Sequence, residues 1–434
     1  MHKGQDLWTR AKSVIPGGNM LLSKRPEMHL PDIWPAYFSR ASGVTVWDLE
    51  DRPLTDMSLM SVGTNTLGYG HPSVDAAVRG VIEAGNMSTL NAPEEVALAE
   101  RLVALHPWAD MARFARSGGE ANAIAIRIAR AASGRDGVAI CGYHGWHDWY
   151  LAANLGDAAG LDGHLLPGLD PAGVPRDLTG TVFPFAYNDL DALRALIAEH
   201  PIGVIKMEVS RSADPAPGFL QSLRELADAG GIVLIFDECT SGFRQAFGGL
   251  HKLYGVDPDL AVFGKALGNG YAITAVIGRR AVMEAAQSTF ISSTFWTERI
   301  GPVAALATLD AMEACRSWEV ITETGRDITR RWQELASAHS LSIRTCGLPA
   351  LTGFDFPGDR ALIYKTLIAQ EMLKAGYLAG TSVYVCTEHR PEVVDRYFDA
   401  LDPVFALIAE CENGRDPATL LEGPVCHAGF SRLA

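Results

Sequence analysis

The chain has 434 residues, 48% of them hydrophobic and 20% charged, which is typical of a globular protein with room for one large and one smaller domain. Its formal net charge of −14 argues against nucleic acid or an anionic membrane surface as the main partner, since both require a basic surface. Seven scattered cysteines without a CxxC motif indicate neither a disulfide framework nor a zinc ribbon.

The first residues lead into no apolar segment, so no secretory signal is expected. No stretch approaches about 18 uninterrupted apolar residues, the length of a membrane span. The expected compartment is therefore the reducing cytoplasm.

Residues 1–68 are expected to mix short strands and turns, with an alternating strand over 44–48. A helical pattern then runs from residue 72 to a stop at Gly85 and Asn86, and a second helix covers 93–105.

Strands and helices alternate from there to about residue 280. This order is typical of a mostly parallel sheet with helices on both faces, an α/β fold. The expected strands are 138–141, 203–207, 232–236, 260–263 and 273–277, and the helices include 121–131, 190–199 and 220–229.

The segment 154–184 is rich in Gly, Pro and Asp and is expected to be a long irregular loop, which is usually functional or covered by a partner. Helices over 302–315 and 322–337 then lead into a C-terminal α+β portion. No internal repeat is found.

Two charged residues follow apolar runs of the predicted sheet. Asp237 comes after 231–236 and Lys265 after 260–264, so each lies where open α/β sheets bind ligands. Burial disfavours a lysine cation, and a neutral amine can form a Schiff base. A nearby carboxylate suits pyridoxal phosphate (PLP), which needs a lysine imine and an anion beside its pyridinium nitrogen. The alternative is an ordinary charge pair at two strand ends.

The segment Ser117-Gly118-Gly119 opens the helix expected over 121–131. Small residues at a helix N-terminus leave backbone N–H groups free for an anion such as phosphate, and the helix dipole assists. The alternative is a serine N-cap followed by glycines that permit tight packing.

A third segment, Tyr143-His144-Gly145-Trp146-His147, directly follows the strand 138–141. Its aromatic rings suit stacking on a flat heteroaromatic ring. No Asp, Glu or Cys with metal-ligand spacing accompanies the two histidines, so we favour structural histidines over a metal site. A nucleoside triphosphatase loop at Lys265 is excluded, because GxxxxGK[ST] is absent.

Together these segments resemble the class-III aminotransferases, PLP enzymes of fold type I, and among them the glutamate-1-semialdehyde aminomutase-like branch. The resemblance covers nearly the whole chain. It is also carried by the motifs Ile15-Pro16-Gly17-Gly18, Gly68-Tyr69-Gly70-His71-Pro72, Phe236-Asp237-Glu238, Gly242-Phe243-Arg244, Gly264-Lys265-Ala266-Leu267-Gly268-Asn269-Gly270 and Ser293-Thr294-Phe295.

The resemblance implies a large PLP-binding domain over 69–310, with a mostly parallel seven-stranded sheet flanked by helices. It also implies a small α+β domain over 311–434, which the N-terminal segment 1–68 joins.

The family's catalytic roles fall on three residues. Lys265 would be the Schiff-base lysine and later the base that moves a proton. Asp237 would pair with the pyridinium nitrogen, and Glu208 matches the family's active-site glutamate. Thr294 would reach the phosphate of the neighbouring subunit, which implies a homodimer.

The remaining cofactor-binding residues implied are Ser117, Gly118, Gly119, Tyr143 and His144. Backbone amides of the two glycines would hold the phosphate, and Tyr143 would stack on the ring.

Four departures from the family pattern stand out. A hydroxyl residue is common where Gly119 stands, and Cys239 replaces a valine that packs under the cofactor; we interpret Cys239 as packing rather than as a nucleophile. Segments 296–299 and 382–386 also differ, and both bear on the substrate rather than the cofactor.

We therefore expect a PLP-dependent transaminase that moves an amino group from a donor such as glutamate to a carbonyl acceptor. The alternatives are an intramolecular 1,2-aminomutase, a PLP-dependent epimerase and a non-catalytic protein of the same fold; the intact Lys265–Asp237 pair weighs against the last. Arg25 and Arg244 are the candidates for binding a substrate carboxylate, each with the alternative of a solvated surface charge.

Overall fold

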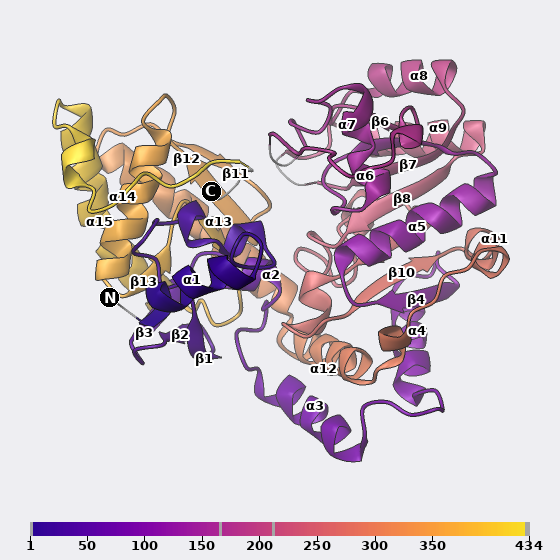
Figure 1. The fold of residues 1–434 in the computed structure, drawn as a ribbon, viewed down its shortest axis with the longest axis horizontal. Helices are drawn as coiled ribbons and strands as arrows, with labels where there is room; N and C mark the ends of the chain where they lie inside the picture. Colours follow the sequence, from indigo (N-terminus) through magenta and orange to yellow (C-terminus); the bar gives the residue numbers. More distant parts are fainter. Residues whose placement is uncertain (1–2, 165–166, 211–212, 430–434) are drawn as a thin grey trace. The chain divides into compact units, whose positions relative to one another are not determined.

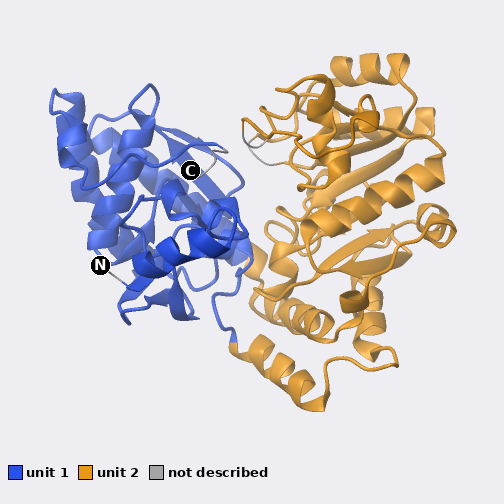
Figure 2. Ribbon diagram, in the orientation of Figure 1, with its two compact units in different colours: residues 1–71, 319–434 blue, residues 72–318 orange. Residues whose placement is uncertain are grey.

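The computed structural model describes residues 3–164, 167–210 and 213–429. The chain divides into two units (Figure 2): one combines residues 1–71 with 319–434, and the other comprises 72–318.

The unit of residues 72–318 is built on a seven-stranded sheet with the order β4-β10-β9-β8-β7-β5-β6 (Figure 1). Strands β9, β8, β7, β5 and β6 run parallel, and β10 is antiparallel to both of its neighbours. Every residue of β7 and β8 is buried, so both sheet faces are covered. The predicted mostly parallel α/β fold is confirmed. The strands are β4 (Met111–Ala115), β5 (Gly137–Cys141), β6 (Val182–Pro184), β7 (Ile202–Glu208), β8 (Val233–Glu238), β9 (Leu260–Phe263) and β10 (Thr274–Gly278).

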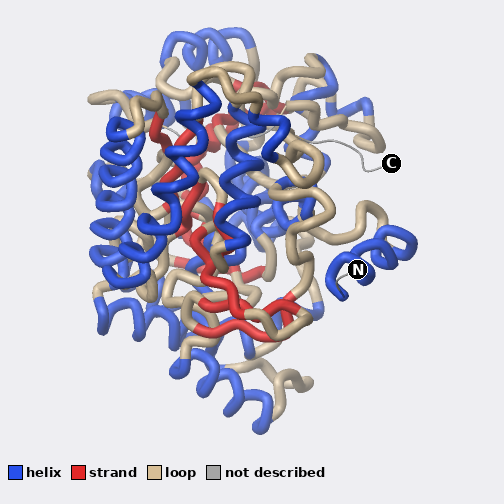
Figure 3. Tube along the Cα trace, turned by 90° about the vertical axis from the view of Figure 1, so that its left-hand side faces the viewer, coloured by secondary structure: helices blue, strands red, loops and turns tan. Residues whose placement is uncertain are grey.

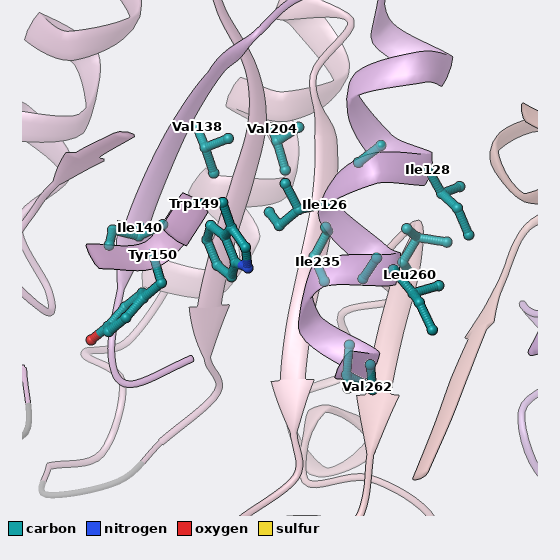
Figure 4. Close-up of a cluster of buried hydrophobic side chains, with 14 of the residues drawn as sticks. Ile126, Ile128, Val138, Ile140, Trp149, Tyr150, Val204, Ile235, Leu260 and Val262 are labelled. Carbon is teal, nitrogen blue, oxygen red and sulfur yellow. The ribbon is translucent and has the colours of Figure 1, made fainter. Parts of the chain in front are cut away.

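Helix α5 (Gly118–Ser133) covers one face of this sheet. Ser117 caps its N-terminus, and Gly134 ends it in the left-handed conformation at φ 66°. Its buried isoleucines belong to the same core cluster as strand residues such as Val204 and Ile235 (Figure 4). Every second residue of the strands packs against the apolar face of α5 in this layer, and this packing holds the carboxyl ends of the strands in place.

The other helices of this unit are α3 (Pro72–Ala84), α4 (Pro93–Leu105), α6 (Asp148–Leu151), α7 (Ala153–Gly156), α8 (Leu190–Glu199), α9 (Phe219–Gly230), α10 (His251–Tyr254), α11 (Arg280–Met283) and α12 (Ile300–Cys315). Helix α13 (Ser317–Ala338) begins here and continues in the other unit.

The unit of residues 1–71 and 319–434 contains two small sheets, β1-β2-β3-β13 and β11-β12-β14. Its core gathers large aromatic residues that include Trp332, Phe354, Tyr397 and Phe405. The elements are α1 (Lys3–Val14), α2 (Met60–Gly63), α14 (Ala361–Lys374), α15 (Pro391–Glu412), β1 (Phe38–Ser42), β2 (Thr45–Asp48), β3 (Pro53–Met57), β11 (Arg344–Cys346), β12 (Leu351–Asp355), β13 (Tyr377–Ala379) and β14 (Ser382–Tyr384).

Three expectations about local structure were incomplete. Helix α1, the blue helix beside the N-terminus in Figure 3, was missed because only Gly4, Trp8 and Ala11 are buried along it. The short or half-exposed strands β4 and β6 were also missed. The segment 154–184 is not wholly irregular, since it includes most of α7 and ends in β6.

Among the residues described, no helix is both long and apolar enough to span a membrane. Within those same residues, no group of three or more His, Cys, Asp or Glu side chains is placed to hold a metal ion.

Candidate active site

Several of the predicted site residues meet at the carboxyl ends of the central strands of residues 72–318. Asp237 in β8 pairs in register with Glu208 in β7, and Lys265 begins the 3-10 turn η4 (Lys265–Gly268) after β9. One detail differs from expectation: Asp237 lies inside β8, which continues through Glu238, rather than after the strand. Parallel strands thus bring residues distant in sequence to one sheet edge.

Asp237 is 2% exposed, and each of its carboxylate oxygens contacts a group of its own chain. Its Oδ2 lies 2.8 Å from Nδ1 of His144, and its Oδ1 accepts a hydrogen bond from the backbone N–H of Cys239 at 3.1 Å. Burial alone would raise the pKa of Asp237, but the charge of Lys206 and the contact with His144 outweigh it and hold this pKa below its ordinary value. Asp237 is therefore an ionised, oriented carboxylate.

Glu238 and His251 fix the end of β8 from the opposite face of the sheet. The buried Glu238 accepts hydrogen bonds from the backbone N–H of His251 at 2.9 Å and from Ser241 Oγ at 2.5 Å. Its Oε1 also lies 2.8 Å from Nδ1 of His251, whose Nε2 accepts from the Trp108 indole at 3.1 Å. This network holds the strand that carries Asp237, because each buried polar group in it is satisfied.

Lys206 is a residue of this site that the sequence analysis missed. Its side chain is fully buried, and Nζ lies 3.7 Å from Oδ2 of Asp237. Across the described residues, Nζ has no hydrogen-bond partner. The available signal was a charge inside the apolar run 203–207, on the strand face shared by Val204 and Glu208.

Lys265 is positioned by its backbone and by a hydroxyl. Its φ is 42°, and its Nζ donates a hydrogen bond to Thr240 Oγ1 at 2.8 Å. At the preceding Gly264, a Cβ would lie 3.2 Å from Sγ of Cys239, so the thiol packs tightly there. Burial raises the pKa of Cys239 well above its ordinary value, which favours packing over a nucleophilic role.

The N-terminus of α5 has free donors beside an engaged serine. Ser117 Oγ accepts a hydrogen bond from the backbone N–H of Glu120 at 3.5 Å, and Glu120 Oε2 accepts from the backbone N–H of Ser117 at 2.9 Å, which together form a capping box. The serine side chain is therefore used for capping. The first-turn N–H groups of Gly118 and Gly119 have no acceptor within the helix, so they can bind an anion.

His147 fills the space that a side chain at Gly119 would take. A Cβ on Gly119 would lie 2.9 Å from Cδ2 and 3.2 Å from Nε2 of this imidazole. In the part of the chain that the structure describes, the buried Nε2 has no hydrogen-bond partner. An orphaned buried nitrogen beside a helix N-terminus is the kind of group that an anionic ligand satisfies. The backbone N–H groups of Gly118 and Gly119 (the glycine cup) and the His147 side chain together therefore fit a phosphate.

Tyr143 and its neighbours are held by Glu208 and by the segment 154–184. Glu208 is 4% exposed, and its Oε2 accepts from the backbone N–H of Tyr143 at 3.1 Å. Gly142 donates to Nδ1 of His164 at 2.9 Å and accepts from Tyr150 at 3.0 Å. His164 was not foreseen, because a loop without periodicity gives no indication of where its side chains return.

The two arginine candidates have different environments. Arg244 is 1% exposed, and its Nε donates to the carbonyl of Thr240 at 2.5 Å, so the alternative of a solvated surface charge is wrong for it. Arg25 belongs to the unit of residues 1–71 and 319–434, where it packs against Gly17, which adopts φ 71°.

Thr294 is exposed at the start of the 3-10 turn η6 (Thr294–Thr297). Within the described ranges, its hydroxyl makes no hydrogen bond to another predicted site residue. The residues that follow Thr294 contact helix α5 and the residue just before its N-cap. Trp296 donates to Glu120 at 3.3 Å, and Glu298 pairs with Arg116 at 2.7 Å.

Comparison with known proteins identifies the family. Residues 30–394 match the model of the class-III aminotransferases. The chain is 32% identical to the 3-aminobutyryl-CoA aminotransferase of Cloacimonas acidaminovorans over 408 residues, which cover 90% of this chain and 93% of the relative. It is 29% identical to the glutamate-1-semialdehyde 2,1-aminomutase of Methanocaldococcus jannaschii, with 93% and 98% covered.

Among solved structures, the FumI protein of Sphingopyxis sp. MTA144 in its PLP internal aldimine form superposes with a TM-score of 0.85 at 26% identity. The superposition covers 96% of this chain and 99% of FumI. The fold and site therefore define a PLP-dependent enzyme of fold type I. The chain belongs to the class-III aminotransferase family and is a PLP-dependent aminotransferase.

Proposed function

We propose that residues 72–318 form the PLP-binding domain and that transamination takes place at the carboxyl ends of the central strands β7 and β8. The observation that carries this proposal is the buried, ionised Asp237 at the same sheet edge as the hydroxyl-bound amine of Lys265. When bound, PLP supplies an aldehyde that links to amines and a ring that takes up negative charge.

Each group in the site then has a specific role. Asp237 holds the ring nitrogen through charge, and His144 fixes the direction of that carboxylate. Lys265 Nζ takes the proton from the amino-bearing carbon of the donor, and Thr240 holds Nζ between turns of the reaction. Glu208 orients Tyr143, whose ring is assigned to one face of the cofactor ring.

The phosphate is assigned to the N–H groups of Gly118 and Gly119, at the helix end that Ser117 caps, together with His147. Thr294 is assigned to the phosphate of a second copy, because it is exposed and bonds to no other site residue in the described chain. The active enzyme is accordingly a homodimer with the site shared between subunits. Arg244 and Arg25 remain the candidates for binding the substrate carboxylate.

We favour transfer between two molecules, from an amino-acid donor such as glutamate to an aldehyde or ketone. The family model is that of the class-III aminotransferases, and the chain's relatives include an aminotransferase at 32% identity over 408 residues and aminomutases at 29% over 434 and 38% over 288 residues, so identity alone does not separate the two reactions. An amino donor added alone should change the visible absorption of the PLP-loaded protein, and the change should stop after one equivalent of donor per site has reacted. Adding a carbonyl acceptor should restore the spectrum.

The competing functions give different results in the same assay. A 1,2-aminomutase would convert an amino-aldehyde with no second amino acid, and an epimerase would exchange the α-hydrogen of an amino acid without a lasting spectral change. Either outcome, with a broad panel of donors inert, would replace transamination.

The phosphate assignment predicts that His147 and a hydroxyl at position 119 are interchangeable. The change His147→Ala removes one donor to a charged group and leaves a space beside Gly119. We expect PLP affinity to fall by about 10- to 150-fold, the equivalent of 1.5–3 kcal/mol for such a hydrogen bond. Equilibrium dialysis measures this loss directly.

Adding Gly119→Ser to His147→Ala should recover most of the affinity, because the serine hydroxyl enters the vacated space. Pyridoxal without its phosphate serves as the matched ligand, and its affinity should be nearly the same in all three proteins. An equal loss for pyridoxal and PLP in His147→Ala would show that His147 supports the loop rather than the phosphate.

A further inference from the structure

Lys206 occupies a position where the sheet otherwise places aliphatic side chains. Along β7, Val204 lies in the apolar layer under helix α5, which also contains Ile235 of β8 (Figure 4). Lys206 follows Val204 on the same strand face and is paired in register with Ile235. A lysine there has a fully buried ammonium, which is costly unless another group compensates its charge.

The charged and titratable groups around this ammonium come from three strand ends. From β8 they are Asp237, at 3.7 Å, and Cys239; from β7, Glu208; and from the turn after β5, His144. Burial lowers the pKa of Lys206, opposed first by Asp237, then by Cys239 and least by Glu208. Burial also lowers the pKa of His144, whose Nδ1 lies 2.8 Å from Oδ2 of Asp237 and whose Nε2 lies 3.2 Å from the carbonyl oxygen of Cys141.

Asp237 is thus already paired with a cation before any ligand arrives. Its Oδ2 faces both His144 and Lys206, and Glu208 is occupied by the N–H of Tyr143. The proposed function brings a second positive group, the protonated ring nitrogen of PLP, to the same carboxylate. Two cations around one buried carboxylate repel each other strongly at low dielectric.

We propose that Lys206 and the ring nitrogen of PLP share the single charge of Asp237, so that cofactor binding expels one proton from this pair of groups. The inference rests on the proposed function, because it requires the ring nitrogen to bind beside Asp237. Lys206 is thereby a positioning residue that acts through Asp237 and makes cofactor loading depend on pH.

The proton comes from the lysine. Lys206 Nζ changes from ammonium to amine and passes H⁺ to bulk water, while the ring nitrogen would keep its proton beside Asp237. No bond between heavy atoms changes. Because the complex holds one proton fewer than its separate parts, PLP affinity rises with pH over the range where the free protein keeps Lys206 protonated.

The test uses Lys265→Ala as the parent protein, because its lysine cannot link to the cofactor and add its own proton change. Calorimetric titration with PLP in buffers of different ionisation enthalpy counts the protons exchanged per cofactor bound. We expect the double variant Lys265→Ala/Lys206→Met to release about one proton fewer than the parent. Across the same pH range, the parent's affinity should gain up to about tenfold more per pH unit than that of the double variant.

The control is Lys252→Met in the same parent. Lys252 is a lysine of the same unit whose Nζ donates to the carbonyls of Leu105 and Phe247 at 3.1 and 2.9 Å, away from Asp237. Its proton count should equal that of the parent. If Lys206→Met prevents folding, the measurement is made on Lys206→Gln, which removes the same charge.

Equal proton counts with and without Lys206 would overturn the inference. They would mean that Lys206 is already neutral in the free protein, or that the site tolerates both cations. Failure of the proposed function gives a different signature: PLP would bind with unchanged affinity when Asp237 is replaced, and borohydride would label no Lys265 peptide in the wild-type protein.

Discussion

Replacing Lys265 with alanine is expected to abolish the stable yellow colour of the purified protein and to lower transamination by a factor of about 10²–10⁴ or more, since the residue that moves the proton is lost. Borohydride treatment of the wild-type protein should fix the cofactor to the peptide that contains Lys265. Mass spectrometry of a proteolytic digest identifies that peptide.

Lys206 makes this test discriminating, because it is a second lysine close to the proposed ring position. Lys206→Met should still give the reduced, labelled Lys265 peptide, whereas Lys265→Ala should give no labelled peptide. A label on Lys206 would show that the cofactor is linked to Lys206 rather than to Lys265. A reducible linkage that persists in Lys265→Ala would refute the role of Lys265 altogether.

The second large effect is expected for Asp237→Asn. The amide keeps the shape and the hydrogen bond with His144 but removes the charge that stabilises a protonated ring nitrogen. Loss of electrostatic stabilisation of this kind costs about 100-fold or more in turnover. We expect the cofactor to remain linked to Lys265, so single-turnover kinetics with a donor measure the loss of rate at full occupancy.

Asp237→Asn also leaves Lys206 as a buried cation without its counter-charge, and removing one partner of a buried pair destabilises a protein by about 3–5 kcal/mol. The double variant Asp237→Asn/Lys206→Met should recover much of this stability in urea unfolding, because neither charge remains. It should not recover turnover. Recovery of turnover would mean that Asp237 acts on the fold rather than on the cofactor.

The sheet and its ligand-binding edge could be predicted because their signals are local. Strand β9 was located at its true bounds, and β5, β7, β8 and β10 within a residue or two, since each is a short apolar run between turns. Asp237 and Lys265 could be placed at one edge because strand ends of a parallel sheet meet there, whereas Glu208 was identified from the family resemblance. Helix α1 and strands β4 and β6 bury too few residues to show a period.

The missed site residues share another physical reason. Lys206 appears in the sequence as one charge in an apolar run, and only the register of β7 against β8 reveals Asp237 3.7 Å away. His147 appears as an aromatic neighbour of Trp146, and only folding shows that it fills the side-chain space of Gly119. His164 returns from a segment without periodicity. Each depends on a contact between residues distant in sequence, which no local pattern records.

The left-handed backbone of Lys265 has a consequence for how this enzyme can evolve. A residue with a Cβ is disfavoured at φ 42° by about 1–2 kcal/mol, so the fold would gain stability from glycine at the one position where lysine is proposed to react. Selection for thermal robustness and selection for turnover therefore act in opposite directions at this residue. A descendant freed from catalysis would be expected to drift toward a more stable, inactive protein beginning at position 265.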